Sequence, residues 1–425
     1  MRRILHLADL HLGYEHRYLG ERSGARSEEA LQILERLVDW AIDDVHYIAA
    51  VLIAGDLFET HEPDPLLIGR VITTLKKIPA SGRTLITVPG NHDEYSYPES
   101  VYRLNAAAWP GVLVTTPTLE RVAGFDLGGF DCEIYSMAYT AGLSPRSLQA
   151  SCCADEGGTP SDKASKDRTS SDKVVGSARG PGGEGPDPGE DARVMAGPQG
   201  STKGSDREIR IALLHGTLDA DPTDRSYRID SRFLVESRFS YAALGHIHKP
   251  AETRIGDGLA VYPGTLNGKG FDDPGAEELV VVSFPDGRPL IERVPFPTRA
   301  IRTRRVDLAR YENQEDFIAG IEQEAHANTI LRLELFGPRP SDFDPAYVEG
   351  RLRDLFFYLE MNDQSMEISA DEIDRLAQQP TIRGFFVQRM REKIAEAGGN
   401  PVRLASMRTA LYKGLAAFES TQRGR

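Results

Sequence analysis

Five apolar segments of this chain lead directly into residues of the types that bind metal ions, and this arrangement constrains the fold more than any other feature. The segments are LHLADLHLG with Asp9 and His11, VLIAGDLFE with Asp56, LITVPGNHDE with Asn91 and His92, RIALLHG with His215, and YAALGHIHK with His246 and His248. Five of the ten histidines fall at these places, which histidines scattered through a core would not do. Ligands gather at the carboxyl ends of strands in open α/β sheets, so we expect these loops to converge in space.

The first half of the chain alternates expected strands and helices. Apolar runs predict strands at Arg3–Ala8, Ala49–Ala54 and Thr84–Val88, and helical spacing predicts helices at Ser27–Val45 and Pro65–Ile78. This β-α-β-α-β order indicates an α/β layered domain. Further strands are expected at Asp131–Met137, Glu208–Leu214, Leu259–Tyr262, Leu279–Phe284 and Leu290–Val294. We place the boundary of this first domain at residue 298.

A change of composition interrupts the first domain. Residues 153–206 consist mainly of Gly, Ser, Pro, Asp and Lys, with almost no large apolar side chains. Such a segment cannot bury enough apolar surface to offset its ordering entropy, so we expect a disordered insertion. Long insertions into surface loops cost little, which favours passive tolerance over a role as a tether.

Two smaller units are expected after residue 298. Residues 299–369 offer strands at Arg304–Leu308, Thr329–Phe336 and Met366–Ile368 and helices at Gln314–His326 and Pro345–Met361, which is the pattern of a small α+β domain. In residues 370–425, two or three amphipathic helices are expected across Ala370–Ser420, split by the run Gly398-Gly399-Asn400-Pro401.

Bulk composition excludes several classes of protein. The 425 residues contain three cysteines in no spaced framework, which indicates a reducing compartment. Polar residues break the first apolar run too early for a signal peptide, and no stretch is long enough for a membrane helix, so we expect a cytoplasmic protein. The net charge of −14 argues against a generally basic nucleic-acid coat. It does not exclude DNA, because bound cations would make a carboxylate-rich site far less negative.

The ligand types define the expected chemistry. Aspartate and histidine suit Mn²⁺, Fe²⁺ or Zn²⁺, and no cysteine is placed to select a softer ion. Two such ions about 3.5–4 Å apart can clamp the attacking and leaving oxygens of an in-line displacement at phosphorus. The sequence therefore favours a centre of two divalent metal ions.

In this order, the motifs D-x-H, GD, GNHD, H and GH-x-H resemble those of the calcineurin-like metallophosphoesterase superfamily. The resemblance implies a two-sheet sandwich flanked by helices. It implies one metal on Asp9, His11, Asp56 and His248 and a second on Asp56, Asn91, His215 and His246, with Asp56 as the bridge. It also implies that His92 is a proton donor or transition-state stabiliser and that Asp93 orients it.

Within this superfamily, LHLADLHLG, GDLFET, PGNHDE and the VYPGTLNGKGF that follows GHIHK resemble the SbcD and YhaO branch of DNA repair exonucleases. That resemblance implies a Mn²⁺-dependent DNA exonuclease and endonuclease with a DNA-binding cap. The implied partners are an SMC-like coiled-coil ATPase such as SbcC and a second copy of the chain. One position departs from the branch: Glu59 stands where some members carry a further active-site histidine, so their balance of exo- and endonuclease activity is not carried over.

Alternatives remain open for the substrate contacts and for the substrate. Lys269 in YPGTLNGKG either contacts a phosphate or belongs to a plain turn. The cluster of Arg299, Arg302, Arg304 and Arg305 either follows a DNA backbone or forms a solvated basic face. A phosphodiesterase or phosphatase for small nucleotides or phosphoproteins would use the same metal centre, although such substrates need no cap domain. A non-catalytic scaffold is disfavoured by the complete ligand set and His92.

Overall fold

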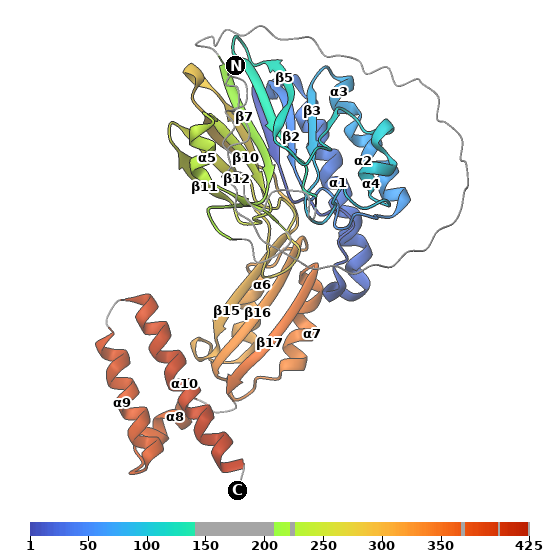
Figure 1. Cartoon of the computed structure of the whole chain (residues 1–425). Coiled ribbons are helices and arrows are strands. Elements are labelled where there is room, and N and C mark those ends of the chain that lie inside the picture. Colours follow the sequence, from blue (N-terminus) through green and yellow to red (C-terminus); the bar gives the residue numbers. More distant parts are fainter. Residues whose placement is uncertain (141–207, 222–225, 367–369, 398–399, 424–425) are drawn as a thin grey trace, which may run out of the picture.

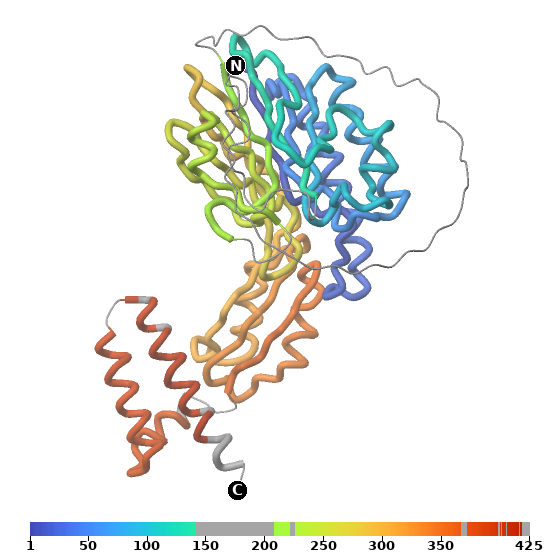
Figure 2. The backbone as a smooth tube through the Cα atoms, in the orientation of Figure 1, coloured from blue at the N-terminus to red at the C-terminus, as the bar shows by residue number. Residues whose placement is uncertain are grey.

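The computed structural model describes residues 1–140, 208–221, 226–366, 370–397 and 400–423. The insertion expected at residues 153–206 lies outside these ranges. Two six-stranded sheets form a sandwich, and Figure 1 shows it at one end of the molecule, with a small sheet beyond it and the C-terminal helices at the other end. The tube in Figure 2 follows the same path from the N-terminus in the sandwich to the last helix.

The first sheet of the sandwich has six strands in the order β14-β13-β1-β2-β3-β4. Strands β1 to β4 run parallel, and β13 and β14 complete the sheet in antiparallel register. The bounds are Arg3–Leu7 for β1, Ile48–Ala54 for β2, Thr84–Val88 for β3, Val112–Leu113 for β4, Glu278–Ser283 for β13 and Leu290–Pro295 for β14.

The second sheet also has six strands, in the order β11-β12-β10-β7-β6-β5. Its central strands β6, β7, β10 and β12 are parallel, and β5 and β11 pair antiparallel at the edges. The bounds are Glu120–Asp126 for β5, Asp131–Ser136 for β6, Glu208–His215 for β7, Tyr241–Gly245 for β10, Ala251–Ile255 for β11 and Gly258–Tyr262 for β12. A short pair, β8 (Thr217–Leu218) and β9 (Arg228–Ile229), lies apart from it.

Apolar side chains fill the space between the sheets and beneath the helices. The inter-sheet core includes Ile4, Leu52, Ile86, Leu213 and Val261. Helices α1 (Ser23–Ile42), α2 (Pro65–Leu75), α3 (Lys77–Ala80) and α4 (Val101–Leu104) belong to the side of the first sheet, and α5 (Ser231–Glu236) packs on the second. The predicted two-sheet sandwich flanked by helices is thereby confirmed.

Local sequence explains where α2 begins. The Asp64 carboxylate accepts hydrogen bonds from the backbone N–H groups of Leu66 and Leu67, and Pro65 occupies the first helical position. The helix buries Val71, Ile72 and Leu75 toward the core, as its apolar spacing predicts.

The three-stranded unit follows the sandwich, with the parallel order β15-β16-β17. Its strands are Ala300–Asp307, Thr329–Pro338 and Tyr358–Met366, and its helices are α6 (Gln314–Glu322) and α7 (Pro345–Leu352). Helix α7 is shorter than the expected Pro345–Met361, and the third strand begins eight residues before Met366. The expected helix was too long because its apolar spacing continues into the following strand. The core of this unit contains Val348, Leu352, Phe356 and Leu359, of which the first two lie on α7 and the last on β17.

Three helices close the described chain: α8 (Ala370–Ala377), α9 (Ile382–Glu396) and α10 (Pro401–Arg423). Leu376, Val387, Met390 and Leu415 belong to their shared core. The Asp307 carboxylate lies 3.6 Å from Arg408, which joins α10 to the end of β15. Within the described ranges, none of the helices is long and apolar enough to cross a membrane.

Candidate metal centre

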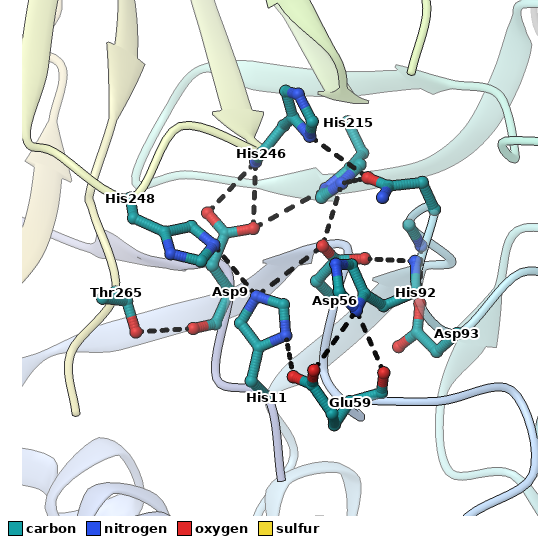
Figure 3. Close-up of polar contacts among 12 residues, drawn as sticks. Asp9, His11, Asp56, Glu59, His92, Asp93, His215, His246, His248 and Thr265 are labelled. Atoms are coloured by element: carbon teal, nitrogen blue, oxygen red, sulfur yellow. Dashed lines mark hydrogen bonds and ion pairs between the residues drawn. The ribbon is translucent and has the colours of Figure 1, made fainter. Parts of the chain in front are cut away.

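The carboxyl ends of five parallel strands deliver polar side chains to one place. Strands β1, β2 and β3 of the first sheet and β7 and β10 of the second all end at this edge, and Figure 3 shows their loop residues facing one another. Asp9, His11, Asp56 and His246 have positive φ values of 54°, 46°, 50° and 101°. Left-handed backbone at residues other than glycine costs free energy and clusters at functional sites.

One group of potential ligands consists of Asp9, His11 and His248, whose donor atoms lie within 4.8 Å of one another. The Nε2 atoms of His11 and His248 are 3.0 Å apart. Asp9 is held in place by the backbone N–H of His246, 2.9 and 3.1 Å from its two oxygens. The Thr265 hydroxyl donates to the Asp9 carbonyl at 2.8 Å, which fixes the backbone of the same residue.

A second group centres on His215 and the amide of Asn91. Asp9, Asp56 and His215 form one cluster of potential ligands. The Asn91 Oδ1 atom lies 2.9 Å from His215 Nε2 and 3.1 Å from His246 Nδ1. Oxygen and imidazole nitrogen atoms from three loops therefore face the same space.

Asp56 lies between the two groups. Its Oδ2 atom is 3.4 Å from His215 Nε2 and 3.7 Å from His11 Nε2, and it also clusters with His11 and His92. Gly90 permits this position, because a Cβ atom there would lie 2.6 Å from the Asp56 backbone nitrogen. The close approach of the loop after β3 to Asp56 thus depends on glycine.

Burial of the ligand side chains shifts their pKa values. The side chains of Asp9 and His215 are 0% exposed, and those of His11 and Asp56 are 2% exposed. Burial raises the pKa of Asp9 to about 6. Burial also opposes ionisation of Asp56 and His215, but their mutual attraction dominates: the pKa of Asp56 falls well below its usual range and that of His215 rises to about 10. Bound protons therefore neutralise part of the negative charge that bound cations would otherwise neutralise.

The donor set fits two divalent ions. Three overlapping clusters offer carboxylate and imidazole ligands, as Mn²⁺, Fe²⁺ and Zn²⁺ prefer. The 3.0 Å between the Nε2 atoms of His11 and His248 suits two ligands of one ion, since bonds to imidazole nitrogen are about 2.1 Å long. His215 donates from Nδ1 to the Ala54 carbonyl at 2.8 Å, which leaves its Nε2 atom to act as a ligand.

His92 differs from these residues, because its side chain is 37% exposed. Its backbone N–H donates to Asp56 Oδ1 at 3.0 Å, and its Nδ1 atom lies 3.0 Å from the Glu59 carbonyl. The expected contact from Asp93 to His92 is not what the described residues show. The Asp93 carboxylate instead accepts from the Gly90 and Phe58 backbone N–H groups, at 2.7 and 3.1 Å, and from the Tyr102 hydroxyl at 2.7 Å.

That difference changes the role expected for Asp93. As a fully buried acceptor of three hydrogen bonds, it fixes the loop that carries Asn91 and His92 rather than the His92 ring. The Glu59 carbonyl orients the His92 ring in its place. Because a carbonyl can only accept a hydrogen bond, the proton of this contact must be on Nδ1 of His92.

Three of the basic residues considered as substrate contacts, Lys269, Arg302 and Arg304, are each paired with an acid. Lys269 Nζ lies 2.8 Å from Glu59 Oε2 and therefore stands beside the metal centre. Arg302 pairs with Glu277 at 2.7 Å and Arg304 with Glu324 at 2.6 Å. The structure thus brings Lys269 to the centre and leaves both arginines on β15, outside it.

Sequence reasoning missed the residues that support the ligands. Asp273 Oδ2 lies 2.6 Å from His248 Nδ1, and Glu59 Oε2 lies 2.9 Å from His11 Nδ1. In the sequence, Glu59 is distinctive only as a departure from the family, and no spacing rule predicts a role for Asp273. Asp273 follows Thr265 by eight residues, in a loop that returns toward His248. Its contact with His248 is apparent only in three dimensions.

Comparisons with known proteins agree with the geometry. Residues 2–250 match the family model described as calcineurin-like phosphoesterase. The chain is similar to the DNA double-strand break repair protein Mre11 of Haloferax volcanii, with 33% identity over 94 residues, 22% of this chain and 20% of that protein. Similarity to Mre11 of Methanopyrus kandleri is 23% identity over 271 residues, 62% of this chain and 48% of that protein. The matches thus span less than half the length of either relative.

A solved structure, a putative 5′-nucleotidase from Staphylococcus aureus in complex with alpha-ketoglutarate, is 11% identical. The match covers 69% of this chain and 54% of the 5′-nucleotidase chain, with a TM-score of 0.36.

Proposed function

The chain belongs to the calcineurin-like phosphoesterase family, and from this premise we propose that it is a two-metal phosphodiesterase that cleaves DNA in repair, with Mn²⁺ as its metal. One observation carries the proposal: three overlapping clusters of buried and partly buried carboxylates and imidazoles meet at the ends of five strands. Two bound divalent ions would supply an activated water and positive charge for the phosphate oxygens.

The chain's own residues divide the remaining work. Asp9, His11 and His248 would hold one ion, and Asn91, His215 and His246 the other, with Asp56 shared. The His92 side chain is 37% exposed at the centre, against 28% for His248, so we assign His92 the contact with the substrate phosphate. With Nδ1 donating to the Glu59 carbonyl, Nε2 would give a proton to the leaving oxygen from the doubly protonated ring, which then returns to the neutral form with its proton on Nδ1.

A polymeric substrate is supported by what lies beside the centre. The relatives are named as DNA double-strand break repair proteins. The three-stranded unit adjoins the loop that follows His248: Ile301 and Ile330 pack with Leu19, and the Arg332 guanidinium lies 4.0 Å from the Phe271 ring centroid. We propose that residues 1–298 form the catalytic domain and that residues 299–369 extend its surface along DNA.

The terminal helices, residues 370–425, are proposed to bind the coiled coil of an SMC-like ATPase. Ile382 and Phe385 on α9 are 82% and 73% exposed, and Val402 on α10 is 75% exposed. A groove between these helices is lined by Pro380, Phe386 and Phe418. Exposed apolar side chains of this size mark interaction sites. Deleting residues 370–425 should release such a partner and leave hydrolysis of a small phosphodiester unchanged; loss of hydrolysis would place these helices in the catalytic unit instead.

The deciding experiment supplies the purified full chain and Mn²⁺ with linear duplex DNA, single-stranded DNA and bis(p-nitrophenyl) phosphate. Cleavage of DNA together with the dye supports the nuclease proposal. Hydrolysis of the dye with both DNAs left intact would instead identify a phosphodiesterase of small substrates. A chain in which Asp56 is replaced by Asn controls for contaminating nucleases, because it should lose all three activities.

A further inference from the structure

Three charged side chains at the start of helix α1 reach beyond the helix itself. Arg22 immediately precedes α1, and Arg26 and Glu29 follow at spacings of four and three residues, which places all three on one side of the helix. The side chain of Arg26 is 0% exposed and that of Glu29 is 23% exposed. This end of α1 lies beside the three-stranded unit in Figure 1, so the three side chains stand at the junction between that unit and the sandwich.

Arg26 reaches the loop that carries Lys269. Its Nη2 atom donates to the Gly268 carbonyl at 3.2 Å, and its Nη1 atom lies 3.1 Å from Glu29 Oε2. Lys269 follows Gly268 directly, and its Nζ atom lies 2.8 Å from Glu59 Oε2 at the metal centre. The Arg26 guanidinium therefore holds the backbone next to Lys269 and connects it to Glu29.

The same Glu29 carboxylate holds the first residue of the three-stranded unit. Arg299 Nε donates to both Glu29 oxygens, at 3.0 and 2.9 Å, and the Arg299 guanidinium carbon lies 3.5 Å from the centroid of the Phe357 ring. Arg22 approaches that ring at 5.5 Å and donates to the Phe356 carbonyl at 3.2 Å. The Arg299 side chain is 12% exposed, so this arginine belongs to the junction and not to a solvated basic face.

A buried bridge of charges such as this one adds little to stability by itself. Taking a guanidinium out of water costs free energy, and apolar side chains of similar volume are often as stabilising or more so. Arg26 bears this cost without full compensation, because its Nε atom has no hydrogen-bond partner among the described residues. What the bridge does fix is relative position, because the planar fork of an arginine meets its acceptors in one defined geometry.

We propose that Arg26, Glu29 and Arg299 form a brace that holds residues 299–369 in register with the loop of Lys269, and that cleavage of long substrates depends on this brace. The inference rests on the proposed function, because it requires DNA to touch both the three-stranded unit and the metal centre. A small phosphodiester needs the metal centre alone. A DNA strand that touches both surfaces is aligned for reaction only if their relation is fixed, since small errors in placement are costly in rate.

Two substitutions cut the brace at its two ends. Arg26→Met removes the contact with Gly268 and leaves Glu29 paired with Arg299, whereas Arg299→Gln removes the contact with the three-stranded unit and leaves Glu29 paired with Arg26. Each full chain is assayed with Mn²⁺ for kcat/KM on linear duplex DNA and on bis(p-nitrophenyl) phosphate. The ratio of DNA cleavage to dye hydrolysis should fall about tenfold in each variant. It should also fall about tenfold in the double variant, because both substitutions cut one brace, and not by the roughly hundredfold of independent effects.

Arg36→Gln is the matched control. Arg36 lies on the same helix and donates to the Pro297 carbonyl at 3.0 Å, with its guanidinium carbon 5.1 Å from the Phe296 ring centroid. Its ratio of the two activities should equal that of the wild type. Thermal unfolding in chelator shows whether each variant is folded.

Hydrogen exchange of the metal-free full chain measures the brace without any substrate. Arg299→Gln should speed the exchange of amides at residues 265–273, although the substitution lies in the other unit, because Glu29 loses the partner that fixes its carboxylate for Arg26. Arg36→Gln should leave this exchange as in the wild type.

The outcomes separate this inference from the proposed function. An equal fall of both activities in Arg26→Met and Arg299→Gln overturns the inference, because a merely structural role would lower both alike. Effects that multiply in the double variant overturn it too, as does wild-type exchange at residues 265–273 in Arg299→Gln. A wild type that hydrolyses the dye and leaves DNA intact rejects DNA as the substrate and with it the dependence on substrate length; the exchange measurement then supports or overturns the brace by itself.

Discussion

The Tyr102→Phe substitution tests how the loop that carries Asn91 and His92 is fixed. It removes only the hydroxyl that donates to Asp93 Oδ2 at 2.7 Å, in a place where both side chains are 0% exposed. Burial raises the pKa of Asp93 to about 6, so the carboxylate is ionised at pH 8. A hydrogen bond to a charged group contributes about 1.5–3 kcal/mol to the free energy of unfolding, and we expect a loss of that size.

The loss should depend on pH. The folded-state pKa of Asp93 lies above its unfolded value, so wild-type stability falls as pH rises through about 6 and is regained in acid. Below pH 6 the protonated carboxyl needs no donor, and the effect of Tyr102→Phe should shrink to that of a neutral hydrogen bond, about 0.5–1.5 kcal/mol.

Urea unfolding at pH 8 and pH 5 measures this difference through the fluorescence of Trp109, whose ring centroid is 4.8 Å from that of Tyr102. Tyr95→Phe, on the same loop and half-buried, is the control and should change stability little. An equal loss at both pH values would show that Tyr102 acts by packing. No loss at pH 8 would refute the hydrogen-bonded role given to Asp93.

Three further predictions concern the metal centre directly. His92→Ala should reduce turnover by about 10²–10⁴-fold while both metals stay bound, as metal analysis of the purified variant would show; an unchanged rate would contradict its role as proton donor. Gly90→Ala brings a Cβ atom to 2.6 Å from the Asp56 backbone nitrogen, so Mn²⁺ affinity should fall, and wild-type affinity would contradict the steric argument. Mn²⁺ affinity should rise about tenfold per pH unit between pH 6 and 10. Burial lowers the pKa of His215, but the attraction of Asp56 outweighs burial and raises that pKa to about 10, so a bound ion must displace a proton from the ring. A Mn²⁺ affinity that does not change with pH would contradict this reasoning.

Much of the centre was predictable from sequence because its ligands follow strands directly. Asp9, Asp56 and His215 each lie at or within two residues of a strand end, so the direction of the parallel strands alone brings them together. Apolar runs identify such strands, and the polar residues that follow them have few structural reasons to be there. The ligand roles themselves stay predictions until metal is bound.

The supporting contacts were not predictable in the same way. Asp93 is adjacent to His92 in sequence, yet its carboxylate turns toward Gly90, Phe58 and Tyr102, because a loop's path decides which neighbours share a side. Arg302 and Arg304 look like a basic cluster in sequence, but Glu277 and Glu324 stand beside them in space. Pairings of this kind join residues far apart along the chain, and local patterns contain no information about them.

The central claim, a pair of metal ions sharing Asp56, is tested most directly by anomalous diffraction from crystals of the full chain grown with Mn²⁺. We predict two peaks per chain, one among Asp9, His11 and His248 and one among Asn91, His215 and His246, with Asp56 in contact with both. A single peak, or two peaks of which only one touches Asp56, would contradict the bridged two-metal centre.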